Sequence, residues 1–402
     1  MRGRTLKLGL AVLEAALAAA LAVALVGCAS GTKTTATTSG GASDTMKIGA
    51  IVSLTGTYAG LGAPEKKTLE LEVKRINDAG GINGKKIEVI IEDDGTDEAK
   101  AVAAATKLID QDKVIALIGA TGTGQTMAVR GEVDKAGIPQ VSMAGGSAIT
   151  ATFDPLVFQT PWSNNLVIPY ELAYMKAHGI TKIGVISDSS GFGKDGLAVT
   201  KAKVGAAGVS IADEEVFNVG DADFSTQLTK IKGSDAQALL VITSGKEAAA
   251  IVQSAKQLGM TLPVYGTHGN ARMEFIQGAG DAAEGFLFAA GKILMPETWG
   301  TDTEAYKVAK AFVDSYSAAN GGEKPNTFAG HAYDAINLIA EAAKRVKGDL
   351  TPAALRDEIE KTSGFVGIGG TFTFSAKDHN GLTDKDLNMY VVKDGTWAIA
   401  PK

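Results

Sequence analysis

The stretch from Val114 to Thr126 reads VIALIGATGTGQT, an apolar run followed by a glycine-rich loop. The run predicts a buried strand, and Gln125 to Lys135 can continue as a helix whose first N–H groups attract anions. The loop lacks the lysine of the phosphate-loop pattern GxxxxGKS/T, because Gln125 stands in its place. The pattern therefore favours a carboxylate over a nucleotide phosphate, with hydroxyl groups available from Thr121, Thr123 and Thr126. A plain turn whose threonines cap the next helix is the alternative.

Apolar runs alternate with helical periodicity from Met46 onward, which is typical of parallel sheets with crossover helices. A first set of runs comprises Lys47–Thr55, Lys86–Asp94, Val114–Gly119 and Pro139–Gly145. A second set comprises Lys182–Asp188, a run ending at Phe217, Ala238–Thr243, Leu262–Thr267 and Gly285–Gly291. Three helical patterns follow at about Thr303–Ala319, Thr327–Lys347 and Pro352–Thr362, and then two late runs, Thr371–Ser375 and Leu387–Val392. We therefore predict two α/β lobes with a ligand cleft at the carboxyl ends of their strands.

The first residues predict export. Arg2, Arg4 and Lys7 precede an apolar segment, Ala15–Val26, that is too short to span a bilayer as a mature helix. The sequence LVGC that ends at Cys28 resembles the lipobox of bacterial lipoproteins. Residues 1–27 are then a signal peptide, Cys28 carries lipid, and residues 28–45, rich in Ser, Thr and Gly, form a flexible tether. The resemblance implies an extracytoplasmic protein, lipid-anchored to the bacterial membrane on the periplasmic side or at the cell surface.

Composition excludes several classes of function. Cys28 is the only cysteine, so no internal disulfide can form. The chain has a net charge of -6 and no basic clusters, which makes nucleic acid an improbable partner. The four histidines lack metal-ligand spacing, and GxSxG is absent. We expect no metal, no cofactor and no catalysis, and we interpret Trp162 as packing at a hinge between the lobes.

The order of several segments resembles the type I periplasmic solute-binding proteins of the branched-chain amino acid (leucine/isoleucine/valine) class, the receptors of ABC importers. These segments are IGAIVSLTGTYAGLG, INDAGGINGKKIEVIIEDD, GATGTGQT, GIPQVSMAGGS, GFGKDG, AKQLGM, GDAAEGF and HAYDAI. The resemblance implies two Rossmann-like lobes, with residues 46–161 plus 291–372 in lobe I and 162–290 plus 373–402 in lobe II. Three crossings are expected near Thr160–Asn164, Ala289–Lys292 and Thr371–Ser375. It also implies an ABC permease as partner and a monomeric receptor.

The same resemblance implies where the ligand binds. Thr123 takes the position of the hydroxyl that binds the ligand carboxylate, and Thr121 contributes backbone or packing. In the next loop Gly146 stands where the family has a threonine, so Ser147 is the possible substitute. His268 stands where the amino acid receptors have the acid that pairs with the ligand ammonium. The expected ligand-binding residues are Leu61, Thr121, Thr123, Ala144, Gly146, Ser147, Phe192, Ser244 and His268.

These departures leave the ligand class open. A branched-chain or other amino acid is the family default. Because His268 cannot supply the negative charge that an ammonium needs, a carboxylate without an α-amino group, such as a 2-oxo, hydroxy or aromatic acid, is the alternative. A sensor that reports ligand occupancy to a signalling partner would use the same fold.

Overall fold

A computed structural model of the protein describes residues 45–402. The expected signal peptide, Cys28 and the tether as far as residue 44 lie outside the described residues. Thr45 already belongs to the first strand, one residue before the expected start of lobe I. Among residues 45–402, no helix is both long and apolar enough to cross a bilayer.

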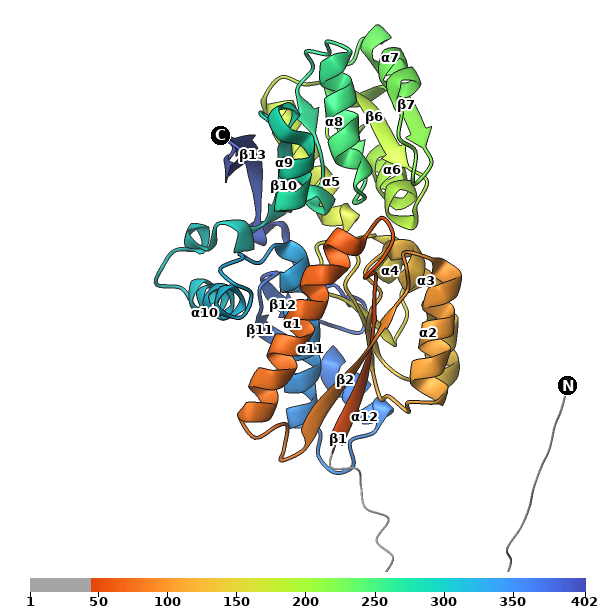
Figure 1. The fold of residues 1–402 in the computed structure, drawn as a ribbon, viewed down its shortest axis with the longest axis vertical. Helices are drawn as coiled ribbons and strands as arrows, with labels where there is room; N and C mark the ends of the chain where they lie inside the picture. Colours follow the sequence, from red (N-terminus) through yellow and green to blue (C-terminus); the bar gives the residue numbers. More distant parts are fainter. Residues whose placement is uncertain (1–44) are drawn as a thin grey trace, which may run out of the picture. The chain divides into compact units, whose positions relative to one another are not determined.

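The first lobe is built on a five-stranded parallel sheet with the strand order β2-β1-β3-β4-β5. Its strands are β1 (Thr45–Val52), β2 (Lys86–Asp93), β3 (Leu117–Gly119), β4 (Gln140–Ser142) and β5 (Val157–Gln159). Its helices are α1 (Ala59–Asp78), α2 (Glu98–Asp110), α3 (Thr123–Ala136), α4 (Ala148–Ala151), α10 (Glu304–Ala319), α11 (Thr327–Arg345) and α12 (Pro352–Glu360). Helix α1 packs against α11, and α2 packs against α3 (Figure 1). A two-stranded sheet of β11 (Ser363–Val366) and β12 (Thr371–Thr373) accompanies this lobe.

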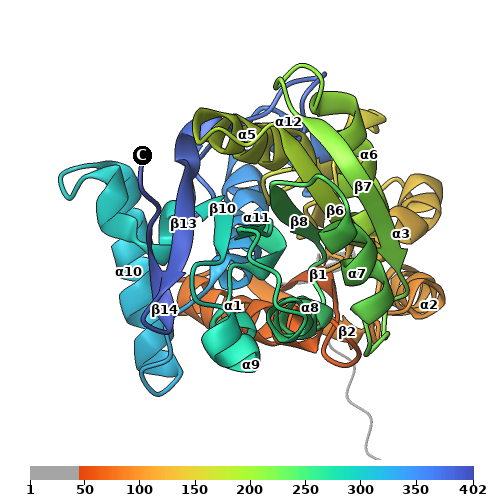
Figure 2. The ribbon, with the colours of Figure 1, turned by 90° about the horizontal axis from the view of Figure 1, so that it is seen from above.

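The second lobe has a seven-stranded sheet with the order β14-β13-β10-β9-β8-β6-β7. Its strands are β6 (Lys182–Asp188), β7 (Ser210–Phe217), β8 (Ala238–Ile242), β9 (Val264–Tyr265), β10 (Leu287–Gly291), β13 (Leu387–Lys393) and β14 (Thr396–Ile399). The pairings of β13 are antiparallel and the others are parallel. Its helices are α5 (Asn164–Ala177), α6 (Gly191–Lys203), α7 (Ser225–Gly233), α8 (Glu247–Gln257) and α9 (Met273–Ala279). Figure 2 shows α5 and α6 on one face of this sheet and α8 and α9 on the other.

Short 3-10 helices complete the chain: η1 (His268–Asn270), η2 (Gly280–Ala282), η3 (Lys292–Leu294), η4 (Pro296–Trp299) and η5 (Asp384–Asp386). The sequence specifies several helix starts through a side chain that accepts a hydrogen bond from the first turn. Asp97 does this for α2, Ser190 for α6 and Asn326 for α11. Such caps contribute about 1 kcal/mol each.

The two predicted Rossmann-like α/β lobes are confirmed, while several of the expected strand runs have different limits and three strands, β5, β11 and β14, were not predicted. The run at Val114 forms a strand only from Leu117, and the run at Leu262 only at Val264–Tyr265. Strands β5 and β14 are short, and neither carries an apolar run long enough to stand out in the sequence.

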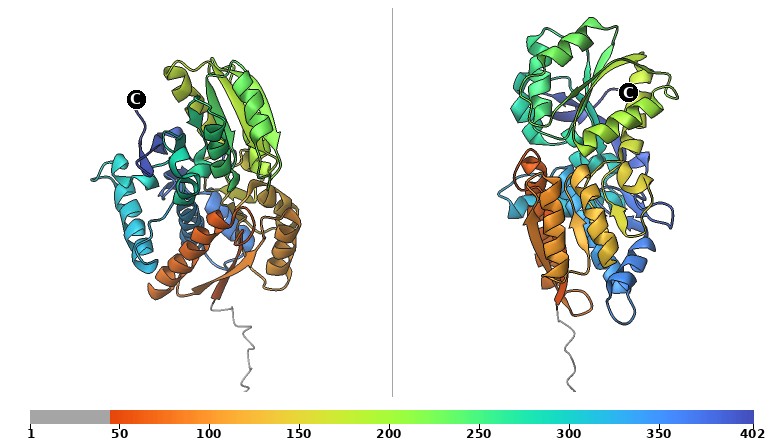
Figure 3. Two further views of the ribbon diagram at one scale, coloured as in Figure 1. Left: turned by 45° about the horizontal axis from the view of Figure 1, so that its top comes forward. Right: turned by 90° about the vertical axis from the view of Figure 1, so that its right-hand side faces the viewer.

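The chain passes between the lobes after β5, after β10 and before β13. Figure 3 shows blue, C-terminal segments in both lobes. Near the first two passages, Trp162 is buried and packs where Gly291 has no side chain; a Cβ there would lie 1.8 Å from its ring. Trp162 therefore holds the two passages together, as expected for packing at a hinge.

The third passage lies later than the sequence indicated. Gln159 of β5 donates its backbone N–H to the carbonyl of His379 at 3.0 Å, and Asn380 donates to the carbonyl of Pro161 at 2.8 Å. Residues up to Gly381 are thus hydrogen-bonded to the first lobe. Lobe II resumes near η5 and β13 rather than at residue 373, because the segment after β12 returns to pair with the edge of the first sheet.

Candidate functional site

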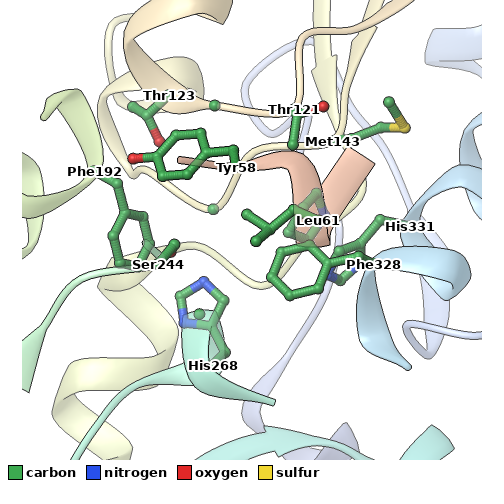
Figure 4. A pocket seen from close by; sticks show the side chains of 14 residues that line it. Tyr58, Leu61, Thr121, Thr123, Met143, Phe192, Ser244, His268, Phe328 and His331 are labelled. Atoms are coloured by element: carbon green, nitrogen blue, oxygen red, sulfur yellow. The ribbon is translucent and has the colours of Figure 1, made fainter. Parts of the chain in front are cut away.

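A small cavity lies where the carboxyl ends of strands from both sheets meet (Figure 4). The loops after β1, β3, β4 and β5 and helix α11 supply its first-lobe wall, and the segments after β6, β8 and β9 supply the opposite wall. The lining residues are Tyr58, Leu61, Thr121, Gly122, Thr123, Met143, Gly145, Pro161, Phe192, Ser244, His268, Gly269, Phe328 and His331. This is the position at which open α/β sheets bind their ligands.

The cavity has a volume of about 20 Å³, room for about one water molecule. An amino acid or organic acid does not fit without movement of the walls. The structure therefore describes a closed arrangement of the lobes, and a solute must enter while the lobes are apart.

Six of the nine predicted ligand-binding residues line this cavity, and Thr123 is among them. Its side-chain oxygen accepts a hydrogen bond from the N–H of Gly146 at 3.1 Å. The hydroxyl proton remains free to be donated. Thr123 is also the first residue of α3, so it lies at the positive end of a 14-residue helix. A carboxylate in the cavity would receive both the O–H bond and the favourable helix field.

Thr121 lines the cavity, but its hydroxyl group is already engaged. It donates to Oε2 of Glu65 at 2.5 Å and accepts from the N–H of Ser53 at 3.0 Å. Burial raises the pKa of Glu65 well above its usual value. These two hydrogen bonds hold the loop at Thr121 in place.

Ala144, Gly146 and Ser147, which were also predicted as ligand contacts, are not among the residues that line the cavity in this closed form. The carbonyl groups of Ala144 and Gly146 both accept hydrogen bonds from the Gln159 side chain, at 2.7 and 2.9 Å. The Ser147 hydroxyl group donates to Asp195 of α6 at 2.7 Å, as does its N–H at the same distance. Asp195 thus joins the second lobe to this loop, and Ser147 is a contact between lobes in the closed form.

Two glycines in this loop allow the cavity walls to approach. A Cβ at Gly145 would lie 2.2 Å from Nε2 of His268, and one at Gly146 would lie 2.3 Å from the Thr123 side chain. Both distances are impossible for real atoms. A side chain at position 146 would therefore force the Thr123 side chain to move.

His268 and Phe192 form one side of the cavity. Their rings contact each other edge to face, with centroids 5.4 Å apart. Neither nitrogen of His268 has a hydrogen-bond partner, although the residue is buried. Burial lowers the pKa of His268 to about 3, so its imidazole is neutral in the closed form.

Helix α11 supplies a second imidazole that sequence reasoning missed. His331 lies between Trp162 and Phe328, with ring centroids 5.7 and 5.8 Å away, and its Nδ1 has no partner. Burial lowers its pKa to about 3 as well. The long amphipathic pattern of α11 indicated only packing against the sheet. The available signal was the histidine in HAYDAI, a titratable residue within a helical pattern rich in apolar residues.

No Asp or Glu is among the 14 lining residues. Acids close to the lining residues have other partners. Asp188 accepts two hydrogen bonds from Ser190, and Glu247 accepts from the N–H of Gly220 at 2.9 Å. Within residues 45–402, no three His, Cys, Asp or Glu side chains are grouped as a metal site would need. The cavity wall thus combines the hydroxyl groups of Thr123 and Tyr58, two neutral imidazoles and aromatic surface.

The fold and the position of this cavity match a known family. Residues 45–396 match the family described as "Periplasmic binding protein". The chain belongs to this family, and its two lobes are those of the type I class that includes the branched-chain amino acid receptors.

Individual relatives are similar over most of their length. The leucine-, isoleucine-, valine-, threonine- and alanine-binding protein of Pseudomonas aeruginosa is 27% identical over 351 residues, which cover 87% of this chain and 90% of the relative. The substrate-binding protein LivJ of Streptococcus pneumoniae, solved with isoleucine, is 32% identical with a TM-score of 0.77, covering 88% and 97% of the two chains. An extracellular ligand-binding receptor of Rhodopseudomonas palustris is 28% identical with a TM-score of 0.83, covering 88% and 99%.

Replacing Thr123 by valine is expected to weaken solute binding by about ten- to a hundredfold. The change removes a charge-assisted hydrogen bond worth roughly 1.5 to 3 kcal/mol while preserving side-chain shape. Isothermal titration calorimetry with the solute released from the purified protein measures the loss. Thr123→Ser, which keeps the hydroxyl group, is the matched control and should bind nearly as the wild type does. Equal affinity in the valine variant would mean that this loop is only a turn.

Proposed function

We propose that the protein is the solute-binding receptor of an ABC importer and that it closes its two lobes around a small carboxylate-bearing solute. The observation that carries this proposal is the interlobe cavity, which is lined by Thr123 from the first lobe and by Phe192, Ser244 and His268 from the second. Lipid on Cys28 would anchor the receptor outside the cytoplasm, and it would deliver the solute, as a monomer, to the permease. Binding and release then suffice, with no catalytic step.

An amino acid is the default solute, and the relatives support it. One relative is named for binding five amino acids, and another was solved with isoleucine. Leucine and related amino acids present the carboxylate that Thr123 would bind.

A specific observation favours a second candidate, an organic acid without an α-ammonium group. The cavity wall holds no carboxylate, and the residue at the expected ammonium position, His268, is neutral in the closed form. A buried ammonium without a negative partner is costly, whereas a keto or hydroxyl oxygen requires only a donor such as an imidazole N–H. Mass spectrometry of the solute released on denaturation distinguishes the two candidates directly.

Solute binding is expected to close the lobes. A solute that contacts both walls binds the closed form more tightly than the open form and shifts the population toward it. Small-angle X-ray scattering should show a smaller radius of gyration with the solute than without it. Thr123→Val at solute concentrations below its weakened Kd is the control and should keep the larger radius. Confirmed binding with an unchanged radius would contradict closure.

A further inference from the structure

A second, larger cavity lies between the lobes and contains a buried arginine. It has a volume of about 150 Å³, enough for several water molecules or a tetrahedral oxyanion. Thr57 and Gly60 line it from the first lobe, and α8, α9 and the loops before them line it from the second. The lining residues are Thr57, Gly60, Lys246, Ala249, Arg272, Glu274, Phe275 and Gly278.

Arg272 is a buried cation without an acidic partner. Its side chain is 4% exposed, and it donates to the carbonyls of Ser244 and Gly245, each at 2.8 Å. A guanidinium group has five N–H donors, so these two bonds leave three, and Nε has no partner. No carboxylate within residues 45–402 forms an ion pair with it; Glu274 and Glu247 act on it only at longer range. Burying a charge in this way is unfavourable unless an anion compensates it.

Two further groups in the lining suit an anion. The Thr57 hydroxyl is buried and has no partner. Lys246 is exposed and forms no ion pair within the described part of the chain. The lining therefore contains two cations, Arg272 and Lys246, and the unpartnered hydroxyl group of Thr57. It contains one carboxylate, that of Glu274. Arginine and lysine together are the usual ligands of phosphate and carboxylate groups.

We infer that this cavity binds a small oxyanion, such as phosphate or a free carboxylate, at a site separate from the solute cavity. Because the lining comes from both lobes, the complete site exists only when they are closed. The anion therefore favours closure. Arg272 also holds the carbonyl of Ser244, whose side chain lines the solute cavity. Solute and anion thus reinforce each other's binding, and linkage requires the effect to be reciprocal.

The site is tested by replacing chloride in the buffer with inorganic phosphate at constant ionic strength. Phosphate should raise the thermal unfolding temperature of the wild type in a saturable way. It should also tighten solute binding by about fivefold or more in calorimetry. Lys246→Ala and Thr57→Val should lose most of both effects. Arg272→Gln should abolish the thermal shift and the tighter solute binding. Circular dichroism checks that this variant still folds. If it does not fold, Lys246→Ala and Thr57→Val still test the site.

Two control variants show whether the phosphate response arises in this cavity. Lys256 is an exposed lysine of α8, the helix that follows Lys246, and it does not line the cavity. Lys256→Ala should therefore keep the full phosphate effect. Thr123→Val weakens the solute site and should also keep the thermal response to phosphate. No saturable response in the wild type, or an unchanged response in Lys246→Ala and Thr57→Val, would overturn the inference even if a carboxylate solute binds. If no carboxylate solute binds but phosphate does, the proposed function fails and this site stands.

Discussion

Leucine is expected to bind at least about a hundredfold more weakly than its 2-oxo acid, in which a keto oxygen replaces the α-ammonium group and the α-hydrogen, if the second candidate, an organic acid, is the solute. The two ligands share a carboxylate and an isobutyl group, so the comparison isolates the ammonium. The cavity offers that charge no carboxylate, only neutral imidazoles, hydroxyl groups, backbone and aromatic rings. Leaving a buried charge without a partner costs several kcal/mol, and each 1.4 kcal/mol is a factor of ten in affinity.

Calorimetry with leucine, valine, isoleucine and phenylalanine and their 2-oxo and hydroxy acids measures this preference. His268→Glu should move the preference toward the amino acids, because it places a carboxylate where the ammonium lies. His268→Gln, which remains neutral, is the matched control and should not. Tighter binding of leucine than of its 2-oxo acid by the wild type would contradict the prediction. Asp94, Asp188 or another acid would then have to supply the missing charge.

Acidification is expected to open the solute-free protein. His268 and His331 are neutral in the closed form, where burial lowers each pKa to about 3. In an open form that exposes both imidazoles, each pKa would return to an ordinary value of about 6.5. The closed form is therefore fully favoured above about pH 6.5 and is lost progressively as the pH falls from 6.5 toward 3. At pH 5 the linkage lowers the ratio of closed to open molecules by about thirtyfold per histidine, and by up to about a thousandfold for both.

Fluorescence energy transfer between labels on the two lobes, recorded from pH 7.5 to 5 without solute, follows this opening. His268→Gln and His331→Gln should each reduce the pH dependence by about one proton, and the double variant should nearly abolish it. His178 is exposed and far from the cavity lining, so His178→Gln is a suitable control and should behave as the wild type does. A closed fraction that stays constant down to pH 5 in the wild type would show that neither imidazole is desolvated by closure.

The sequence anticipated the loop at Thr123 well, because its features are local. An apolar run, three glycines and a helical pattern specify a strand, a turn and a helix start within about 13 residues. The structure has that order, with Thr123 opening α3. The loop at Ala144 was anticipated less well. Whether Ser147 faces a ligand or Asp195 depends on where α6 of the other lobe lies, and no local pattern contains that information.

The alternation of runs and helices, by itself, determined the two α/β lobes, since strand and helix periodicities are properties of neighbouring residues. The glycine-rich loop likewise determined a helix start next to Thr123, where the first N–H groups of the helix attract anions. Tertiary structure alone decided the late third passage between the lobes, the engagement of Ser147 by Asp195, and the convergence of His268 with His331. Each of these depends on residues far apart in the chain, whose packing against one another excludes water and sets their charge state.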